Sequence, residues 1–429
     1  MIVRNTDLSA MRRNTILMLL LLSGAAACTK KSRTNSLHSL SEANTDEEKM
    51  IITEDSFADI DITFQEKSFI TANIPKQDKE VQLDTVFESY SFIPLETNEK
   101  SVVGRIEKIL VCQDCFCILD RDNSNIFLFE FDGKFRCSLG KKGHGPGEHV
   151  DAWNVAYDKD SQEVVLLDLA GRKLMHYDLK GNLKRTEPMY YLYTDFEYQK
   201  DKMFIYTGTS YNEFSDILDL YQLIIAERNQ KPQIRTFKTS ENIRSMFSYG
   251  ARLKKSGDEV IYDDLLSDTL WGISKGNLSP LIAVRFNKGP RFSKEEKRHM
   301  TDKLFRERNN QVGSVSDWQV SSDYISILVR TPETGRRLFN VIYSRKSGKY
   351  KIIGRKVGNS RLGDYVTSAA FDGVYDNKSF IRIVEPMDII RDIEDKRLEK
   401  ILSVEERELL ENIKADNNPV LLIERIVDF

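Results

Sequence analysis

The histidines are the first residues to test for catalysis, because imidazole exchanges protons most readily near neutral pH. The chain has five: His38, His144, His149, His176 and His299. Three of them, His144, His149 and His176, lie close together in the sequence. A histidine-based lyase or a three-histidine metal site would need histidines from several separate parts of the chain, so we do not expect either. No Gly-x-Ser-x-Gly motif marks a serine nucleophile. Carboxylates are numerous enough to leave a carboxylate-based site open.

The cysteines beyond Cys28 form a second group with possible chemistry. They are Cys112, Cys115, Cys117 and Cys137. A structural zinc site needs two separated pairs of ligands, and the sequence offers no second pair. Gln113 and Asp114 read as a two-residue hairpin turn, which would make Cys112 and Cys115 cross-strand neighbours. In an oxidising compartment this pair could form a disulfide.

Two further segments resemble ligand-binding loops but lack residues that such loops need. The glycine-rich segment GKKGHGPGE at residues 140–148 lacks the Lys-Ser or Lys-Thr end and the following helix of a phosphate loop. The segment that starts at Asp120 resembles a calcium loop, but Asn125 and Phe131 stand where glycine and glutamate are required. We therefore predict no metal and no cofactor.

The N-terminus predicts export. Arg12 and Arg13 precede an apolar run at residues 16–22, and small residues then lead to Cys28. A charged start, a short apolar run and small residues at a cleavage site define a secretory signal. The cysteine after them resembles a lipobox, although Ala25 stands where leucine is usual. We expect a signal peptide over residues 1–28 and lipid on Cys28; an ordinary signal peptide remains the alternative.

The polar segment after Cys28 has few aromatic residues and little periodicity, which is typical of a disordered tether. We place this tether at residues 29–85 and the folded domain at residues 86–429. The expected location is the cell envelope, with a lipid anchor in the outer membrane; the side of that membrane stays open.

The charge balance excludes one class of partner. The chain has 63 basic and 66 acidic residues, for a net charge of −3. Nucleic-acid binding depends on a basic surplus that neutralises phosphates. We predict no nucleic-acid partner.

An internal repeat indicates the elements that must position any site. Residues 109–136 align with residues 157–185 at a spacing of 48, so that Asp120 matches Asp168 and Gly133 matches Gly181. Each unit holds short β-rich runs divided by tight turns. Four antiparallel strands in 45–50 residues are typical of a propeller blade.

The rest of the body continues this pattern with more divergence. Further blades are expected at residues 196–237, 251–286 and 318–353, and a last one includes residues 365–384 and closes with 420–427. Capping boxes at Ser293 and Ser403 predict two helical insertions. We predict an all-β fold, a six-bladed β-propeller with short helical insertions; seven blades or a two-sheet sandwich remain open.

Four segments resemble those of the six-bladed β-propeller lipoproteins of Gram-negative anaerobes, which are related to NHL-repeat and TolB-like propellers. They are FIPLET at residues 92–97, GKKGHGPGE at 140–148, SDTLW at 267–271 and NPVL at 418–421. This resemblance implies export, membrane tethering and a propeller, but no settled activity.

Blade topology predicts where a ligand would bind. The turn between the second and third strands and the crossover to the next blade emerge on the same face, and loops on a rigid scaffold commonly carry function. The residues expected on this rim are Arg121, Asn123, His144, Glu148, Trp153 and Arg172. The leading hypothesis is a non-enzymatic binding or scaffold module for a glycan, a peptide or an envelope protein. The alternative is a propeller hydrolase or lyase acting on glycans or peptides.

Overall fold

The computed structural model describes residues 69–71, 85–208, 221–238, 251–264, 266–274, 277–285, 291–330, 338–353, 370–395, 398 and 402–429. The predicted signal peptide, the lipidated Cys28 and all of the predicted tether except residues 69–71 and 85 lie outside these residues. All of these residues belong to one compact unit, residues 52–429.

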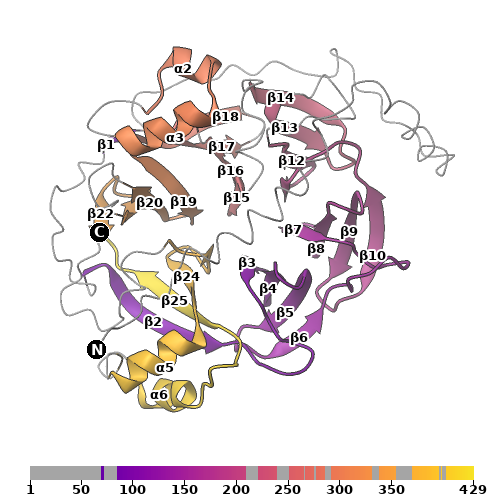
Figure 1. Ribbon diagram of the computed structural model, residues 1–429, viewed down its shortest axis with the longest axis vertical. Coiled ribbons are helices and arrows are strands. Elements are labelled where there is room, and N and C mark those ends of the chain that lie inside the picture. The colour runs from indigo at the N-terminus through magenta and orange to yellow at the C-terminus, as the bar shows by residue number, and fades with distance from the viewer. Residues whose placement is uncertain are drawn as a thin grey trace, which may run out of the picture. The chain divides into compact units, whose positions relative to one another are not determined.

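The described strands form six sheets that are arranged in a ring (Figure 1). The first blade consists of β3 (Ile106–Val111), β4 (Cys115–Asp120), β5 (Asn125–Glu130) and β6 (Phe135–Ser138). The second consists of β7 (Ala152–Asp158), β8 (Glu163–Asp168), β9 (Lys173–Asp178) and β10 (Leu183–Pro188). The third consists of β11 (Asp195–Gln199), β12 (Lys202–Tyr206), β13 (Tyr221–Glu227) and β14 (Pro232–Lys238).

The other three blades are less regular. The fourth consists of β15 (Leu253–Ser256), β16 (Glu259–Asp264), β17 (Thr269–Ser274) and β18 (Asn277–Arg285). The fifth consists of β19 (Ser314–Val320), β20 (Tyr324–Arg330), β21 (Leu338–Ser344) and β22 (Tyr350–Ile353). The sixth consists of β23 (Gly373–Val374), β24 (Ser379–Val384), β25 (Val420–Ile426) and β2 (Phe87–Pro94). The prediction of a six-bladed propeller is therefore confirmed.

The sixth blade closes the ring with strands from both ends of the domain. β2 pairs antiparallel with β25, so that Phe92 lies opposite Leu422. A closed toroid of repeats predicts that its N- and C-terminal strands share one sheet, and the pairing confirms this prediction. The ring is therefore closed by backbone hydrogen bonds between β2 and β25. A propeller needs this closure because an open ring would leave strand edges and apolar faces in water.

The hydrophobic core is divided into six layers between neighbouring blades. One layer joins Phe116 and Phe127 of the first blade to Ile381 and Leu421 of the sixth, and so seals the ring. The remaining layers join successive blades in the same way. Because strand residues alternate between the two faces of a sheet, each blade contributes one apolar face to each of two layers. This explains the nearly continuous burial of the middle strands.

The repeated aspartates tie each blade together at one end. Asp120 accepts hydrogen bonds from the backbone N–H groups of Gly104 and Asp122, and from the Asn123 side chain at 2.7 Å. Asp168 similarly accepts from the N–H groups of Val150, Asp151 and Gly171. Both carboxylates are fully buried. The 48-residue repeat thus reflects structure: each aspartate joins a turn to the segment that leads into the innermost strand.

Helical insertions lie beside two of the blades (Figure 1). The helices α2 (Lys294–Arg298) and α6 (Val404–Glu411) both begin with the predicted capping boxes, at Ser293 and Ser403. The sequence predicts that Leu409, Leu410 and Ile413 form the apolar side of the second insertion. Leu410 is buried, but Leu409 is 47% exposed, so the prediction is wrong at Leu409. Two helices were not predicted from the sequence: α3 (Asp302–Gln311), which is separate from α2, and α5 (Pro386–Glu394). None of the helices in the described ranges has the length and apolar character needed to cross a membrane.

Part of the predicted tether pairs with the propeller. β1 (Phe69–Thr71) runs parallel to β18 and makes the fourth blade a five-stranded sheet. A short strand on an outer edge satisfies backbone groups that would otherwise face water. The chain therefore makes contact with the ring before the predicted domain start at residue 86.

Candidate ligand site in the central channel

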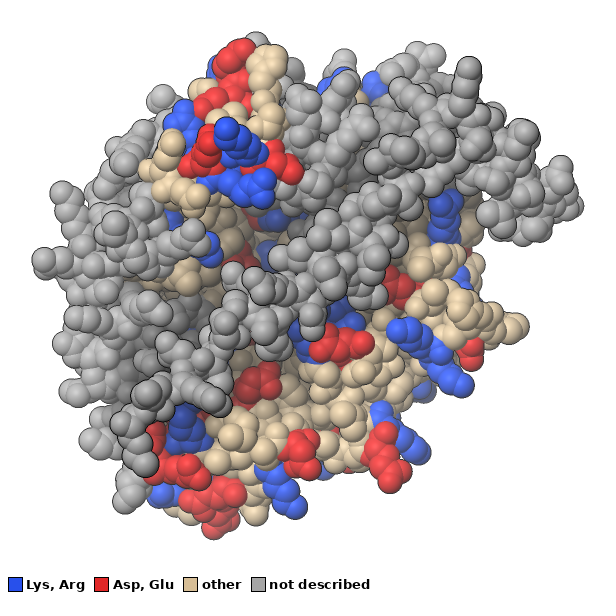
Figure 2. Space-filling model, viewed as in Figure 1, with Lys and Arg blue, Asp and Glu red and all other residues tan. Residues whose placement is uncertain are grey.

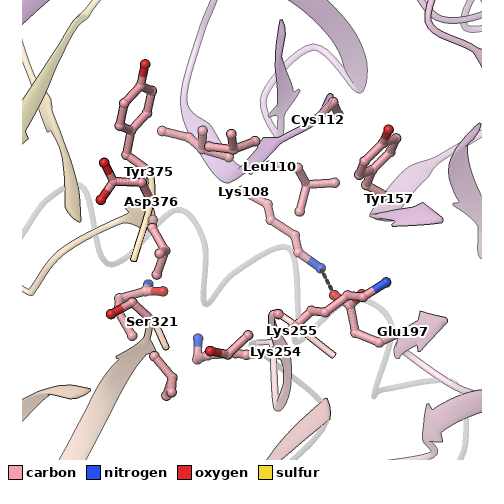
Figure 3. Close-up of a pocket in the computed structure, with 18 of the residues that line it drawn as sticks. Lys108, Leu110, Cys112, Tyr157, Glu197, Lys254, Lys255, Ser321, Tyr375 and Asp376 are labelled. Atoms are coloured by element: carbon pink, nitrogen blue, oxygen red, sulfur yellow. Dashed lines mark ion pairs between the residues drawn. The ribbon is translucent and has the colours of Figure 1, made fainter. Parts of the chain in front are cut away.

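The channel opens at one end into a cavity of about 790 Å³. Its walls are innermost strands together with the turns that join them to the second strands of their blades. Figure 3 shows side chains from several blades converging on this space. The volume is in the range of pockets that hold small organic ligands.

A charged cluster stands at one side of the cavity. Lys108 on β3 lies 3.6 Å from the Glu197 carboxylate of β11, and Figure 3 shows this ion pair. The same amine donates a hydrogen bond of 3.1 Å to Asn154 and lies 3.9 Å from Asp195. Asp195 also accepts hydrogen bonds from the backbone N–H groups of the segment that begins β15. Four neighbouring blades are therefore linked through polar groups at the channel wall.

Glu197 is the most strongly perturbed carboxyl of this cluster. Burial raises its pKa to about 7, although Lys108 and Lys255 act in the opposite direction. The side chain is only 5% exposed. A carboxyl that titrates near neutral pH can hold or release a proton under physiological conditions, and such groups concentrate at functional sites.

Two more lysines line the cavity from β15. Lys254 and Lys255 are half-buried, and as neighbours in a strand they leave it on opposite sides (Figure 3). Burial lowers the pKa of the Lys254 amine. Within the described part of the chain, no carboxylate lies within 4.0 Å of either amine. These two cations thus face the cavity without a direct ion pair of that kind.

The acidic residues on the other side of the cavity are held by the sixth blade. Asp376 forms an ion pair of 3.3 Å with Arg425 and accepts hydrogen bonds from two backbone N–H groups of its own turn. Asp372 accepts a hydrogen bond of 2.7 Å from the Ile383 N–H. Burial raises the pKa of Asp372. These carboxylates are committed to their own blade.

Polar and aromatic groups complete the walls. Tyr157 and Tyr375 line the cavity with partly exposed rings (Figure 3). Tyr375 packs against Phe116 and Phe131, with ring centroids 6.0 Å apart in both pairs. This packing fixes the tyrosine in place. Rigid aromatic rings beside hydrogen-bonding groups suit a ligand that has both polar and apolar faces.

The predicted rim lies at the opposite end of the blades from this cavity, because the rim is formed by turns at the other ends of the same antiparallel strands. Within the rim, the Arg121 guanidinium stacks over the Trp153 ring at 4.4 Å. Arg121 also reaches the Trp153 backbone carbonyl at 3.4 Å, and the Trp153 indole N–H donates to the Thr194 carbonyl at 3.0 Å. These two rim residues are brought together and bind each other.

The other rim residues are more dispersed. Asn123 donates to Asp120, and Glu148 accepts a hydrogen bond of 2.8 Å from the Gly145 N–H within its own loop. His144 and Arg172 are exposed. The rim thus has one stacked pair and several separate polar groups, and it stays a predicted site.

Basic and acidic side chains are interspersed among the described residues on the face shown in Figure 2.

The cysteines lie in the first blade. The Cys112 N–H donates to the Cys115 carbonyl at 2.8 Å, so the pair flanks a two-residue hairpin turn, as the sequence predicts. All four are free thiols in the structure, and burial strongly raises the pKa of Cys117. The disulfide stays a prediction. Among the described residues, no group of three or more His, Cys, Asp or Glu side chains is arranged to hold a metal ion.

Comparison with known proteins identifies the family and supports the fold. The model of the family described as Domain of unknown function (DUF4934) matches residues 68–425. A Bacteroides fragilis protein named as exported superposes with a TM-score of 0.65 at 14% identity, over 84% of this chain and 99% of that chain. A DUF4221 family member from Bacteroides vulgatus gives a TM-score of 0.47 at 10% identity, over 80% and 97% of the two chains. No curated protein matches the sequence.

Proposed function

The chain belongs to the DUF4934 family, and we propose that it is a non-enzymatic binding or scaffold lipoprotein of the bacterial cell envelope. Its ligand is a polar molecule, a glycan or a peptide, that occupies the mouth of the central channel. The cavity of about 790 Å³ carries this proposal, because it combines aromatic rings, hydrogen-bonding groups and two lysines that form no ion pair with the described carboxylates in one concave space.

We place the ligand in the channel and not on the rim because of the polar groups that each offers. A binding site needs polar groups whose hydrogen bonds are still available, since each bond to a ligand otherwise replaces an existing one. Arg121 and Trp153 already bind each other, whereas Lys254 and Lys255 line the cavity with no carboxylate of the described residues within 4.0 Å of either amine. The rim remains the alternative position for the same function.

Catalysis on glycans or peptides is the second candidate, and one observation favours it. Glu197 titrates near neutral pH beside the cavity, as a general acid or base would. However, glycoside hydrolysis requires two carboxyl groups that face the scissile bond. Asp195, the neighbouring carboxylate, is already bound by Asn154 and by backbone N–H groups. Binding is therefore the function that the geometry supports better.

Calorimetric titration of the purified protein with neutral and acidic oligosaccharides and with peptides tests the proposed function. We expect saturable binding of at least one of these ligands, and chromatography should recover the ligand intact after long incubation. Recovery of cleaved products would favour the enzyme instead, and failure of every ligand class to bind would contradict the binding function.

The envelope location rests on Cys28 and on the similarity to a protein named as exported. Kinship with NHL-repeat or TolB-like propellers belongs to the same proposal. We expect Cys28→Ala to move the protein from the detergent-soluble membrane fraction to the soluble periplasmic fraction, because a lipid chain supplies the membrane affinity. Unchanged partitioning of Cys28→Ala in a fractionated cell lysate would contradict the lipid anchor.

A further inference from the structure

Not every lysine of the cavity wall has a carboxylate of the described residues at ion-pair distance. Lys108 is paired with Glu197 and Asp195. Lys254 projects into the cavity from β15 (Figure 3), and no carboxylate of the described residues lies within 4.0 Å of its amine. Removing an ammonium group from bulk water is unfavourable unless an anion compensates it. A negatively charged ligand would supply that compensation.

The acidic residues that line the cavity cannot supply it, because each has another partner. Glu107 forms an ion pair of 3.2 Å with Arg105. Asp376 is paired with Arg425, and Asp372 with a backbone N–H of β24. Lys254 and Lys255 therefore provide positive charge for a ligand on the β15 side of the cavity.

The rest of the cavity indicates what kind of anion would fit. Its volume exceeds what a simple inorganic ion requires, and its mouth carries the polar side chains of Gln319, Ser322 and Asn377. The rings of Tyr157 and Tyr375 add flat apolar surface. A sugar presents hydroxyl groups at its edge and C–H groups on its face, so it can use both kinds of wall.

We infer that the channel cavity binds an acidic oligosaccharide, whose negatively charged group is held by the Lys254 amine and whose sugar rings contact the tyrosine and amide walls. This inference deepens the proposed binding function and rests on it. The charged group is a carboxylate or a sulfate ester, since either provides the oxygen anion that an ammonium group binds.

Isothermal titration at pH 7 tests the inference with three trisaccharides: tri-galacturonic acid, a sulfated trisaccharide and neutral maltotriose. We expect one or both acidic ligands to bind at least about 10-fold more tightly than maltotriose. We also expect Lys254→Met to weaken acidic binding by about 10-fold or more, which corresponds to the loss of one charged contact. Lys254→Arg keeps the charge and should retain most of the affinity.

The matched control is Lys346→Met, which removes an exposed lysine of the β21–β22 turn that is not among the residues lining the cavity. It should leave the affinity unchanged. Lys254→Gln replaces Lys254→Met if circular dichroism shows that the methionine variant does not fold. Equal binding of acidic and neutral sugars, or full affinity in a folded Lys254→Met, would overturn the inference while the proposed binding function stands. Tight Lys254-dependent binding of penta-glutamate without binding of either acidic sugar would also overturn it, in favour of a peptide.

Discussion

Lys108 and Glu197 show why the channel differs from the other layers of the molecule. The layers between blades are mainly apolar, with buried ion pairs such as Arg382–Glu424. In the channel, the side chains of Lys108 and Glu197 are 15% and 5% exposed and lie against each other beside the cavity. Isolated charges at such positions would be costly, and pairing offsets part of that cost. Replacing the pair by apolar residues could preserve the fold, so its presence indicates that the channel is kept polar.

The titration of Glu197 gives a prediction with a definite sign. Its carboxyl faces Lys108 from β3, Lys255 from β15 and Asp195 from its own strand, and its pKa is raised from 4.5 to about 7. Between these values the unfolded chain has lost the proton and the folded protein has kept it. The contribution of Glu197 to stability is therefore fully present below about pH 4.5 and is lost as the pH rises to 7.

We expect this loss to disappear in Glu197→Gln, which cannot titrate. The free energy of unfolding of the wild type relative to this variant should fall by roughly 3 kcal/mol from pH 4.5 to pH 8, because one pKa unit corresponds to about 1.4 kcal/mol. Urea unfolding of both proteins at the two pH values measures it. The same wild-type-to-variant difference at both pH values would show that Glu197 is ionised throughout.

The sequence could predict the rim residues but not the channel residues, and the reason is physical. A lysine or glutamate in a strand is expected to face solvent, so Lys108, Glu197 and Lys254 carry no signal when each strand is considered separately. They meet only because the ring brings β3, β11 and β15 to one axis. The one available clue was that the innermost strands interrupt their apolar runs with charges, as at residues 107–108 and 254–255.

At the scale of the element, the aligned glycines mark turns whose backbone no other residue fits well. Gly133 and Gly181 both have φ of +87° in equivalent turns. A Cβ added to Gly133 would overlap the Pro94 carbonyl oxygen of β2. The turn therefore does more than reverse the chain: it allows the first blade to contact the sixth.

Gly257 offers a matched comparison, because it also has a positive φ but nothing lies within 4 Å of an added Cβ. We expect Gly257→Ala to lower the free energy of unfolding by about 1 kcal/mol, the cost of the left-handed backbone. Gly133→Ala should cost about 3 kcal/mol, since a backbone carbonyl must also move. Thermal or urea unfolding compares the two, and an equal cost for both would mean that the Gly133 turn adapts without strain.

The elements with strong local signals were predicted well, and the others were missed for identifiable reasons. Repeated aspartates, glycine turns and capping boxes are local, and they located the blades and two helices. The helix α5 begins at Pro386 without a side-chain cap, so its start carries only a weak signal. The pairing of β1 with β18 is a contact between segments more than 200 residues apart in the chain, as Phe69 and Ala283 show, and no local pattern indicates it.

At the scale of the whole molecule, closure of the ring is what creates the site. β25 and β2 complete the sixth blade, and the Arg425 of β25 holds Asp376 at the cavity mouth. The ring has two faces, each with its own set of turns. We propose that the ligand binds at the mouth formed by the turns between first and second strands. The Arg121 and Trp153 pair on the opposite face makes mainly structural contacts.

The most direct test compares two variants in calorimetric titration with the same oligosaccharide. Ser322→Trp combined with Asn377→Trp places bulky rings on two exposed turn residues of the cavity mouth. Arg121→Ala, His144→Ala and Trp153→Ala together remove the polar and aromatic groups of the rim. With both proteins shown to be folded, we predict that the mouth variant loses at least about 10-fold in affinity and that the rim variant stays within about 2-fold of the wild type. Loss of binding in the rim variant, with full affinity in the mouth variant, would contradict the assignment of the ligand to the channel.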